Sequence, residues 1–193
     1  MSHGHGASHG DGDNKKIAIF ISLLALLLAV AETAGKSAQT NALSYNVEAS
    51  NLWSFFQAKT IRKTTMETAA EHLEIDAQLA SDPQAKQLLQ TRIAGWKARA
   101  ANYESEPKPN DLGEGRRELM ARAKQAEEKR DLAMAKYHHY EVASAAFQIA
   151  IVLASAFVIT SVVYLAWIAG GLGALGLIFM AIGFFAPHAV HLL

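Results

Sequence analysis

The 193-residue chain contains no cysteine, only four prolines, and no aspartate, glutamate, lysine or arginine after Glu141. The lack of cysteine excludes disulfides, thiolate catalysis, iron–sulfur clusters and cysteine-ligated zinc. Lysine and arginine number 18 and aspartate and glutamate number 18, so the formal net charge is +0 and no excess of positive charge favours nucleic acid as a partner. What remains is a chain in which 51% of the residues are hydrophobic, concentrated in a few segments.

The longest uncharged stretch covers residues 142–193 and is strongly apolar. As a single helix its 52 residues would extend roughly 78 Å at ~1.5 Å per residue, which is too long for one crossing of a bilayer and long enough for two. The glycine-rich segment 169–173 favours a turn. We therefore predict transmembrane helices over 142–168 and 172–193, with a re-entrant hairpin as the alternative.

A third apolar stretch, residues 17–31, follows two lysines near the beginning of the chain. Its length and small-residue end are compatible with a signal peptide, but the segment before it carries two aspartates, which argue against one. We predict a retained transmembrane helix over 15–34. Residues 1–14 are rich in histidine and glycine and are predicted to form a disordered tail.

Most charged residues lie in the middle of the chain, residues 35–141, where apolar and small side chains recur at the spacings of three and four that are typical of coiled coils. A turn is predicted near 81–83, where Asp82 can cap a helix beginning with proline, and a break near 105–111, where two prolines disfavour helix. The limbs on either side of the turn match in length, which predicts a long antiparallel hairpin. The alternative folds residues 84–103 back as the third helix of a short bundle. The predicted seam positions are Leu52, Phe56, Met66, Ala70, Leu73, Ala77, Ala80, Leu89, Ile93, Trp96, Ala100, Tyr103, Leu119, Ala126, Ala133 and Tyr140.

The predicted fold class is therefore all-α. We expect an integral membrane protein with three transmembrane helices and a long antiparallel coiled-coil-like helical hairpin outside the bilayer. Gly176 and Gly183 are seven residues apart and share one face of the last helix, where the absence of side chains allows close helix packing.

Two polar residues, Glu32 and Gln148, stand inside the predicted transmembrane helices. Each lies about one turn inside the hairpin-side end of its helix, and the two helices run in opposite directions. The matching depth predicts a hydrogen bond between the two side chains. A carboxylate at this depth is a candidate for function, and the two interpretations are a structural clamp and an ion site.

Histidines form the one group of potential metal ligands in the tail: His3, His5 and His9. A flexible histidine-rich tract can bind a transition metal weakly, but no further ligand completes a defined site, so a solvated tail is the expected state. No phosphate-binding loop, nucleophile motif or metalloprotease motif is present. We therefore expect no enzymatic activity, no cofactor and no small-molecule substrate.

One short motif of the chain resembles an element of a known protein family. The run Trp53-Ser54-Phe55-Phe56-Gln57-Ala58-Lys59, followed by the basic residue Arg62, resembles the recurring element of a bacterial family known only as a domain of unknown function. Members of that family also look like an N-terminal span, a charged helical middle and C-terminal spans, so the resemblance implies this architecture and no activity. Two interpretations of the motif stay open: packing against the descending limb, or docking of the aromatics at a lipid interface with Lys59, Arg62 and Lys63 facing the headgroups.

These features predict a non-enzymatic multi-pass protein of the bacterial inner membrane that acts in assembly or scaffolding. Its expected partners are the lipid bilayer and either further copies of itself or a membrane-protein complex, but no nucleic acid. One alternative is a small channel or transporter subunit with Glu32 and Gln148 near a polar path, and another is a metal-handling protein that uses the tail. Basic residues near the predicted spans lean towards a cytoplasmic hairpin, although Lys15 and Lys16 favour the opposite orientation.

Overall fold

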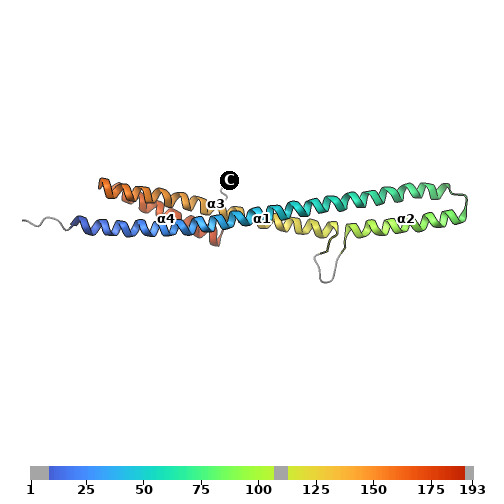
Figure 1. The fold of residues 1–193 in the computed structure, drawn as a ribbon, viewed down its shortest axis with the longest axis horizontal. Helices are drawn as coiled ribbons and strands as arrows, with labels where there is room; N and C mark the ends of the chain where they lie inside the picture. The colour runs from blue at the N-terminus through green and yellow to red at the C-terminus, as the bar shows by residue number, and fades with distance from the viewer. Residues whose placement is uncertain (1–8, 107–112, 190–193) are drawn as a thin grey trace, which may run out of the picture. The chain divides into compact units, whose positions relative to one another are not determined.

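The computed structural model describes residues 9–106 and 113–189, and all regular structure in these residues is helical. The helices are α1 (His9–Leu79), α2 (Pro83–Glu104), α3 (Arg116–Thr160) and α4 (Val163–Phe185), shown in Figure 1. The chain divides into unit 1, Met1–Leu43 with Arg130–Leu193, and unit 2, Ser44–Lys129. The all-α class is confirmed, and α1, α3 and α4 are each long and apolar enough to cross a membrane.

In unit 2 the chain turns back after α1, at residues 80–82. The Asp82 carboxylate accepts hydrogen bonds from the backbone N–H groups of Gln84 (3.1 Å) and Ala85 (3.2 Å), and Pro83 occupies the first helical position. An aspartate cap satisfies donors that the helix cannot, and proline is tolerated only at such a start. The turn therefore lies where the sequence analysis placed it.

The second helix returns antiparallel to α1, as Figure 1 shows. It packs Ile93 against Ala70 and Ala77 of α1, with Leu73, Leu89 and Trp96 around them. The first part of α3 continues the descending limb and packs on an earlier stretch of α1, through Ala49, Leu52, Leu119, Ala123 and Ala126. Because α2 and α3 pack on successive stretches of α1, the alternative of residues 84–103 as a third bundle helix is wrong. Every predicted seam position is buried or half-buried.

Unit 1 combines the beginning of α1, the end of α3 and the whole of α4. The main cluster of buried residues in it consists of Leu24, Phe147 and five alanines, with larger, partly buried hydrophobic side chains packed against them. Small side chains let helix backbones approach closely, which lets a few large residues fill the space that remains. The alanines are Ala31, Ala143, Ala150, Ala154 and Ala169.

The predicted boundary between the last two helices is wrong. The chain does not turn at 169–173: α3 ends at Thr160, α4 begins at Val163, and the glycines lie inside α4. The reversal uses Ser161, which has a left-handed φ of 57°, and the Val162 N–H donates to the Thr160 hydroxyl at 3.4 Å. The ranges 142–168 and 172–193 are corrected accordingly. The first predicted span and the ascending limb of the predicted hairpin both belong to α1, which continues past residue 34.

Candidate functional site

The motif that begins at Trp53 forms the contact of α1 with the descending limb of unit 2. Trp53 and Phe56 pack edge to face with ring centroids 5.4 Å apart, against the core around Leu119. The indole Nε1 of Trp53 donates to Glu127 of α3 at 2.9 Å. A half-buried tryptophan whose N–H has found an acceptor is fixed in orientation. For Trp53 and Phe56 the structure therefore agrees with the packing interpretation.

The next turns of α1 meet the place where α2 ends and α3 begins. The Arg116 guanidinium lies 4.9 Å from the centroid of the Phe56 ring, which is a cation–π contact. The Lys59 ammonium lies 5.4 Å from the Tyr103 ring centroid and 3.8 Å from a carboxylate oxygen of Glu106. The motif thus supplies both the apolar and the charged contacts that hold the α2–α3 junction.

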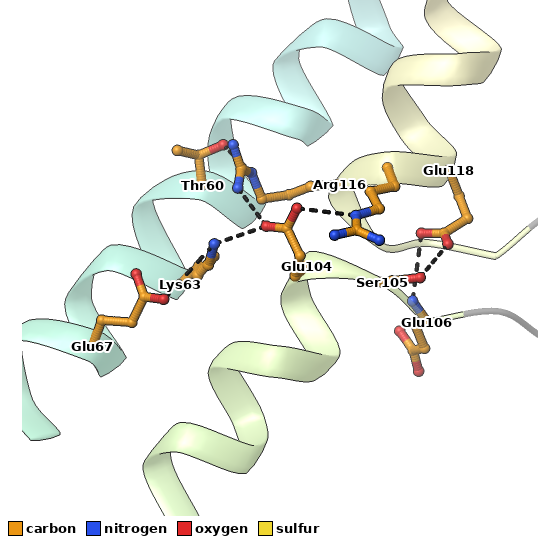
Figure 2. A network of polar contacts seen from close by, with 9 residues as sticks. Thr60, Lys63, Glu67, Glu104, Ser105, Glu106, Arg116 and Glu118 are labelled. Atoms are coloured by element: carbon orange, nitrogen blue, oxygen red, sulfur yellow. Dashed lines mark hydrogen bonds and ion pairs between the residues drawn. The ribbon is translucent and has the colours of Figure 1, made fainter.

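Glu104 is the centre of this junction (Figure 2). Its Oε2 accepts hydrogen bonds from Lys63 of α1 at 2.8 Å and from Nη1 of Arg116 of α3 at 2.6 Å, while Arg117 approaches Oε1 at 3.4 Å. The Arg116 Nε also donates to the Thr60 hydroxyl at 2.9 Å. One carboxylate therefore ties the end of α2 to both neighbouring helices. Charge-assisted hydrogen bonds of this kind are stronger than neutral ones.

A second carboxylate closes the other side of the junction. Glu118 of α3 accepts a hydrogen bond from the Ser105 hydroxyl at 2.6 Å and approaches the Glu106 N–H at 3.4 Å (Figure 2). The Ser105 hydrogen bond, which favours the charged form, lowers the pKa of Glu118. The Glu104 and Glu118 network was missed in the sequence analysis. The signal available was a set of charged residues on both sides of the predicted break.

The hydrogen bond from Lys63, aided by the Arg116 charge, lowers the pKa of Glu104 from its usual 4.5 to about 2. Because the folded pKa is below the unfolded one, the stabilisation from Glu104 is complete above about pH 4.5 and is lost as the pH falls towards 2. We expect the protection factors of amides near the junction, which divide out the intrinsic pH dependence of exchange, to fall from pH 6 to pH 3 in the native protein and to fall less steeply in Glu104→Gln. Glu48→Gln, at an exposed residue outside the junction, should keep the native slope. The same slope in all three proteins would contradict the role of Glu104.

Part of the motif faces outward on α1. Five of its residues are exposed, with Phe55 59% exposed: Ser54, Phe55, Gln57, Ala58 and Arg62. The motif therefore has two faces, and only one of them is used within the chain.

Glu32 and Gln148 are brought together in unit 1. The predicted hydrogen bond is confirmed: the Gln148 side-chain N–H donates to the Glu32 carboxylate at 3.1 Å. The pair lies in a groove of about 420 Å³ between α1 and α3, whose polar lining also includes Lys36, Gln39 and Glu141. Both side chains of the pair are exposed at the surface of the unit, so the pair is open to the surroundings and not sealed in the helix packing.

We expect Glu32→Gln to retain the native stability of unit 1 and Glu32→Leu to reduce it by about 1 kcal/mol, the usual size of such interhelical hydrogen bonds. Glutamine keeps an acceptor for Gln148, and leucine removes it. The measurement is the thermal unfolding of each variant in the same detergent micelle. Equal midpoints for the glutamine and leucine variants would show that the hydrogen bond stabilises nothing.

Gly176 and Gly183 are both buried on α4 and face α3 of the same chain. A Cβ added at Gly176 would lie 2.7 Å from the Phe147 ring, and one at Gly183 would lie 3.0 Å from the Cβ of His139. The two glycines thus allow α4 to pack closely against α3 within one chain.

His139 was not selected in the sequence analysis, although it is 1% exposed. Its Nε2 lies 3.0 Å from the Pro187 carbonyl oxygen. Since a carbonyl can only accept, Nε2 carries the hydrogen and His139 joins α3 to the segment after α4. Its Nδ1 is buried with no hydrogen-bond partner among the described residues.

The candidate metal ligands of the tail cannot be placed. His3 and His5 and the side chain of His9 lie outside the described residues. Within the described residues, no group of three or more histidine, aspartate or glutamate side chains could hold a metal ion.

The sequence was compared with known families, curated proteins and solved structures. The model of a family described as a domain of unknown function (DUF4337) matches residues 13–186. No curated protein and no solved structure matches the chain.

Proposed function

The chain belongs to the DUF4337 family, a domain of unknown function, and since this membership supplies no activity we propose from the geometry of the chain that it is a non-enzymatic multi-pass membrane protein acting in assembly or scaffolding. Unit 1 anchors it in the bacterial inner membrane through three spans. Unit 2 is the helical hairpin outside the bilayer, leaning cytoplasmic, that holds partner helices.

The observation that carries the membrane assignment is the distribution of aromatic side chains on α4. Tyr164 and Trp167 near its beginning are 79% and 77% exposed, and Phe184 and Phe185 at its end are 68% and 81% exposed. Between them no polar side chain occurs, and the outward residues Leu175, Leu177 and Ile178 are apolar. From Tyr164 to Phe185 a helix rises roughly 32 Å, close to the thickness of a hydrocarbon core. Aromatic residues gather at both membrane interfaces in this way.

The outward surface of α1 in unit 1 supports the same assignment. Ile19, Leu23, Leu26 and Val30 are 49% to 70% exposed on the stretch between Lys15–Lys16 and Lys36. Such a row of large apolar side chains is costly in water at ~25 cal/mol per Å² and favourable against lipid.

A scaffolding role is supported by the construction of unit 2. Its polar groups are engaged in structural contacts: Lys63 and Arg116 each pair with the Glu104 carboxylate and stabilise the junction. The charged network thus fixes the spacing of three helices, which is what a platform for partner helices requires.

The membrane assignment is tested with single cysteines, which the native chain does not contain. Three spans place residue 81 and residue 161 on opposite sides of the membrane. We expect Ser81→Cys and Ser161→Cys to react with a membrane-impermeant maleimide from opposite faces, using right-side-out and inverted vesicles, with the unmodified protein as the unlabelled control. Labelling of both from the same face, or release of the protein from membranes into detergent-free buffer, would overturn the assignment.

A small channel or transporter subunit is the second candidate, and the exposed Glu32–Gln148 pair favours it. A carboxylate turned outward from a span must meet water, lipid or another chain, and lipid is the least favourable of these. Ion flux into liposomes that contain the purified protein, lost in Glu32→Gln, would support conduction. Equal flux with native and variant protein would leave the scaffold as the better proposal.

A further inference from the structure

The polar groove between α1 and α3 of unit 1 lies at one edge of the proposed membrane. A Cβ added at Gly183 would lie 3.3 Å from the Tyr140 ring, and one added at Gly35 would lie 3.3 Å from the Tyr140 Cβ. These contacts place Gly35, Tyr140 and the end of α4 at one level along unit 1. Phe184 and Phe185, the exposed aromatic pair that marks one membrane interface, follow Gly183 directly. The level of Gly35 is therefore the level of that interface.

The Glu32–Gln148 pair of the groove lies deeper than this level. Glu32 comes three residues before Gly35, and Gln148 comes eight residues after Tyr140, which puts their Cα atoms roughly 4.5 and 12 Å into the span. Both side chains are exposed at the surface of unit 1. The hydrocarbon of the lipid tails offers a carboxylate neither a hydrogen bond nor a counter-charge. The outward carboxylate of Glu32 therefore requires a positively charged partner that reaches this depth.

The charged groups that line the groove are held apart from one another. Lys36 lies one turn from Glu32 on α1, but the two form no ion pair in the part of the chain that the structure describes. The Glu32 carboxylate accepts its hydrogen bond at Oε1 from an uncharged amide. Glu141 of α3 accepts from the Tyr137 hydroxyl at 3.3 Å and lies 3.7 Å from Nδ1 of His138. The groove thus presents two carboxylates and a separate ammonium, which together complement a ligand that carries charges of both signs.

Apolar side chains continue the two walls of the groove towards the centre of the bilayer. One turn deeper on the same helix faces, Leu28 precedes Glu32 on α1 and Val152 follows Gln148 on α3. Val152 is 65% exposed, and Leu28 is partly buried against the unit 1 core. A ligand seated here meets charged groups at the interface and apolar groups below it. This is the distribution of polarity along a phospholipid, whereas a free ion or a soluble amine would use only the polar end.

We propose that this groove binds the headgroup of a phospholipid with a primary ammonium group, of which phosphatidylethanolamine is the simplest. The proposal rests on the proposed function, because it requires that unit 1 spans the membrane. The ammonium donates to the carboxylates of Glu32 and Glu141, and the phosphate accepts from Lys36. The volume of about 420 Å³ is within the ~300–1,000 Å³ that is usual for ligand sites.

The chemistry of the groove distinguishes this headgroup from two common alternatives. A choline headgroup has the same charge but no N–H to donate to a carboxylate, and a glycerol headgroup brings no positive charge to Glu32. Mass spectrometry of the purified full chain under non-denaturing conditions measures the difference. Equal amounts of dioleoyl phosphatidylethanolamine, phosphatidylcholine and phosphatidylglycerol are added to the micelles. We expect the ethanolamine lipid to be retained at least about fivefold more than either of the others.

Three variants assign this preference to the groove. Glu32→Gln removes the charge but keeps an acceptor for Gln148, so it separates lipid binding from helix packing. We expect Glu32→Gln to lose the preference for the ethanolamine headgroup. Glu48→Gln, the same exchange at an exposed position of α1 outside the groove, should keep it. Lys36→Gln should reduce retention of the ethanolamine lipid, because the phosphate loses its cation.

Thermal unfolding in micelles gives a second readout. Because a ligand of the folded state stabilises it, added phosphatidylethanolamine should raise the unfolding midpoint of the native protein and of Glu48→Gln, but not that of Glu32→Gln. Equal retention of the three lipids, preference for another headgroup, or an unaltered preference in Glu32→Gln would overturn the lipid site. Labelling at residues 81 and 161 distinguishes that result from failure of the proposed function. Labelling from opposite faces together with equal lipid retention would remove only the lipid site.

Discussion

Gly176→Ala is expected to destabilise the helix packing of unit 1 by about 1–3 kcal/mol, the usual cost of inserting an extra carbon into a packed core. The new Cβ would lie between 2.7 and 2.9 Å from three atoms of the Phe147 ring. Phe147 is 0% exposed and belongs to the buried core of unit 1, against which larger side chains such as Phe20 and Phe179 also pack. It therefore has no free space into which to move, and α4 must shift away from α3.

The neighbouring glycines provide the matched control. A Cβ at Gly171 meets no atom within 4 Å, so Gly171→Ala should leave stability unchanged or raise it slightly, because alanine favours helix more than glycine does. The measurement is thermal unfolding of the full chain in one detergent, followed by helical circular dichroism. If both alanine variants unfold at the native midpoint, the close approach of α4 to α3 at Gly176 is not what holds unit 1 together.

The glycines of α4 illustrate a structural feature that the sequence alone did not predict correctly. Residues 169–173 were expected to form the turn because glycine is common in turns, but an apolar helix also uses glycine to bring backbones together. The sequence pattern does not distinguish these roles. The reversal lies at Ser161, a residue without the conformational freedom of glycine, and the only local sign was a pair of hydroxyl residues in an otherwise apolar run.

Periodic features were predictable. The seam of the hairpin follows from spacing alone, because helical geometry places residues three and four apart on one face. The Glu32–Gln148 hydrogen bond followed from depth, since two polar groups in apolar helices have few other partners. Both predictions required only local geometry and the direction of each helix.

The Glu104 network could not be predicted in the same way. Lys63 and Arg116 reach Glu104 because α2 stops at residue 104 and α3 restarts on the same side of α1. Which lysine meets which carboxylate depends on the path of the chain between the two helices, and no periodic rule describes that path. The motif at Trp53 could be recognised from the sequence, but its contact with the junction depends on that path and could not be predicted.

The second large effect is expected at the centre of the hairpin. Leu119→Ala should destabilise unit 2 by about 2–5 kcal/mol, through loss of buried surface and the cavity that remains. Leu119 is 2% exposed and packs with Ala49 and Leu52, and alanine neighbours are too small to fill the space. The loss of stability should be near the lower end of this range if Trp53, which is held by its hydrogen bond to Glu127, can still tilt into the cavity.

Because the chain has two units, hydrogen exchange resolved by segment is the suitable measurement, since it assigns a loss of stability to one unit. A loss of about 2 kcal/mol corresponds to roughly thirtyfold faster exchange. We expect this acceleration in α1 around Leu52 and in α3 around Leu119, while unit 1 keeps its native rates. Leu88→Ala, which truncates a leucine that is 70% exposed, should stay within about 0.5 kcal/mol of the native protein. Equal protection in the Leu119 and Leu88 variants would mean that unit 2 is stabilised mainly by its charged junction and not by the apolar seam between α1 and α3.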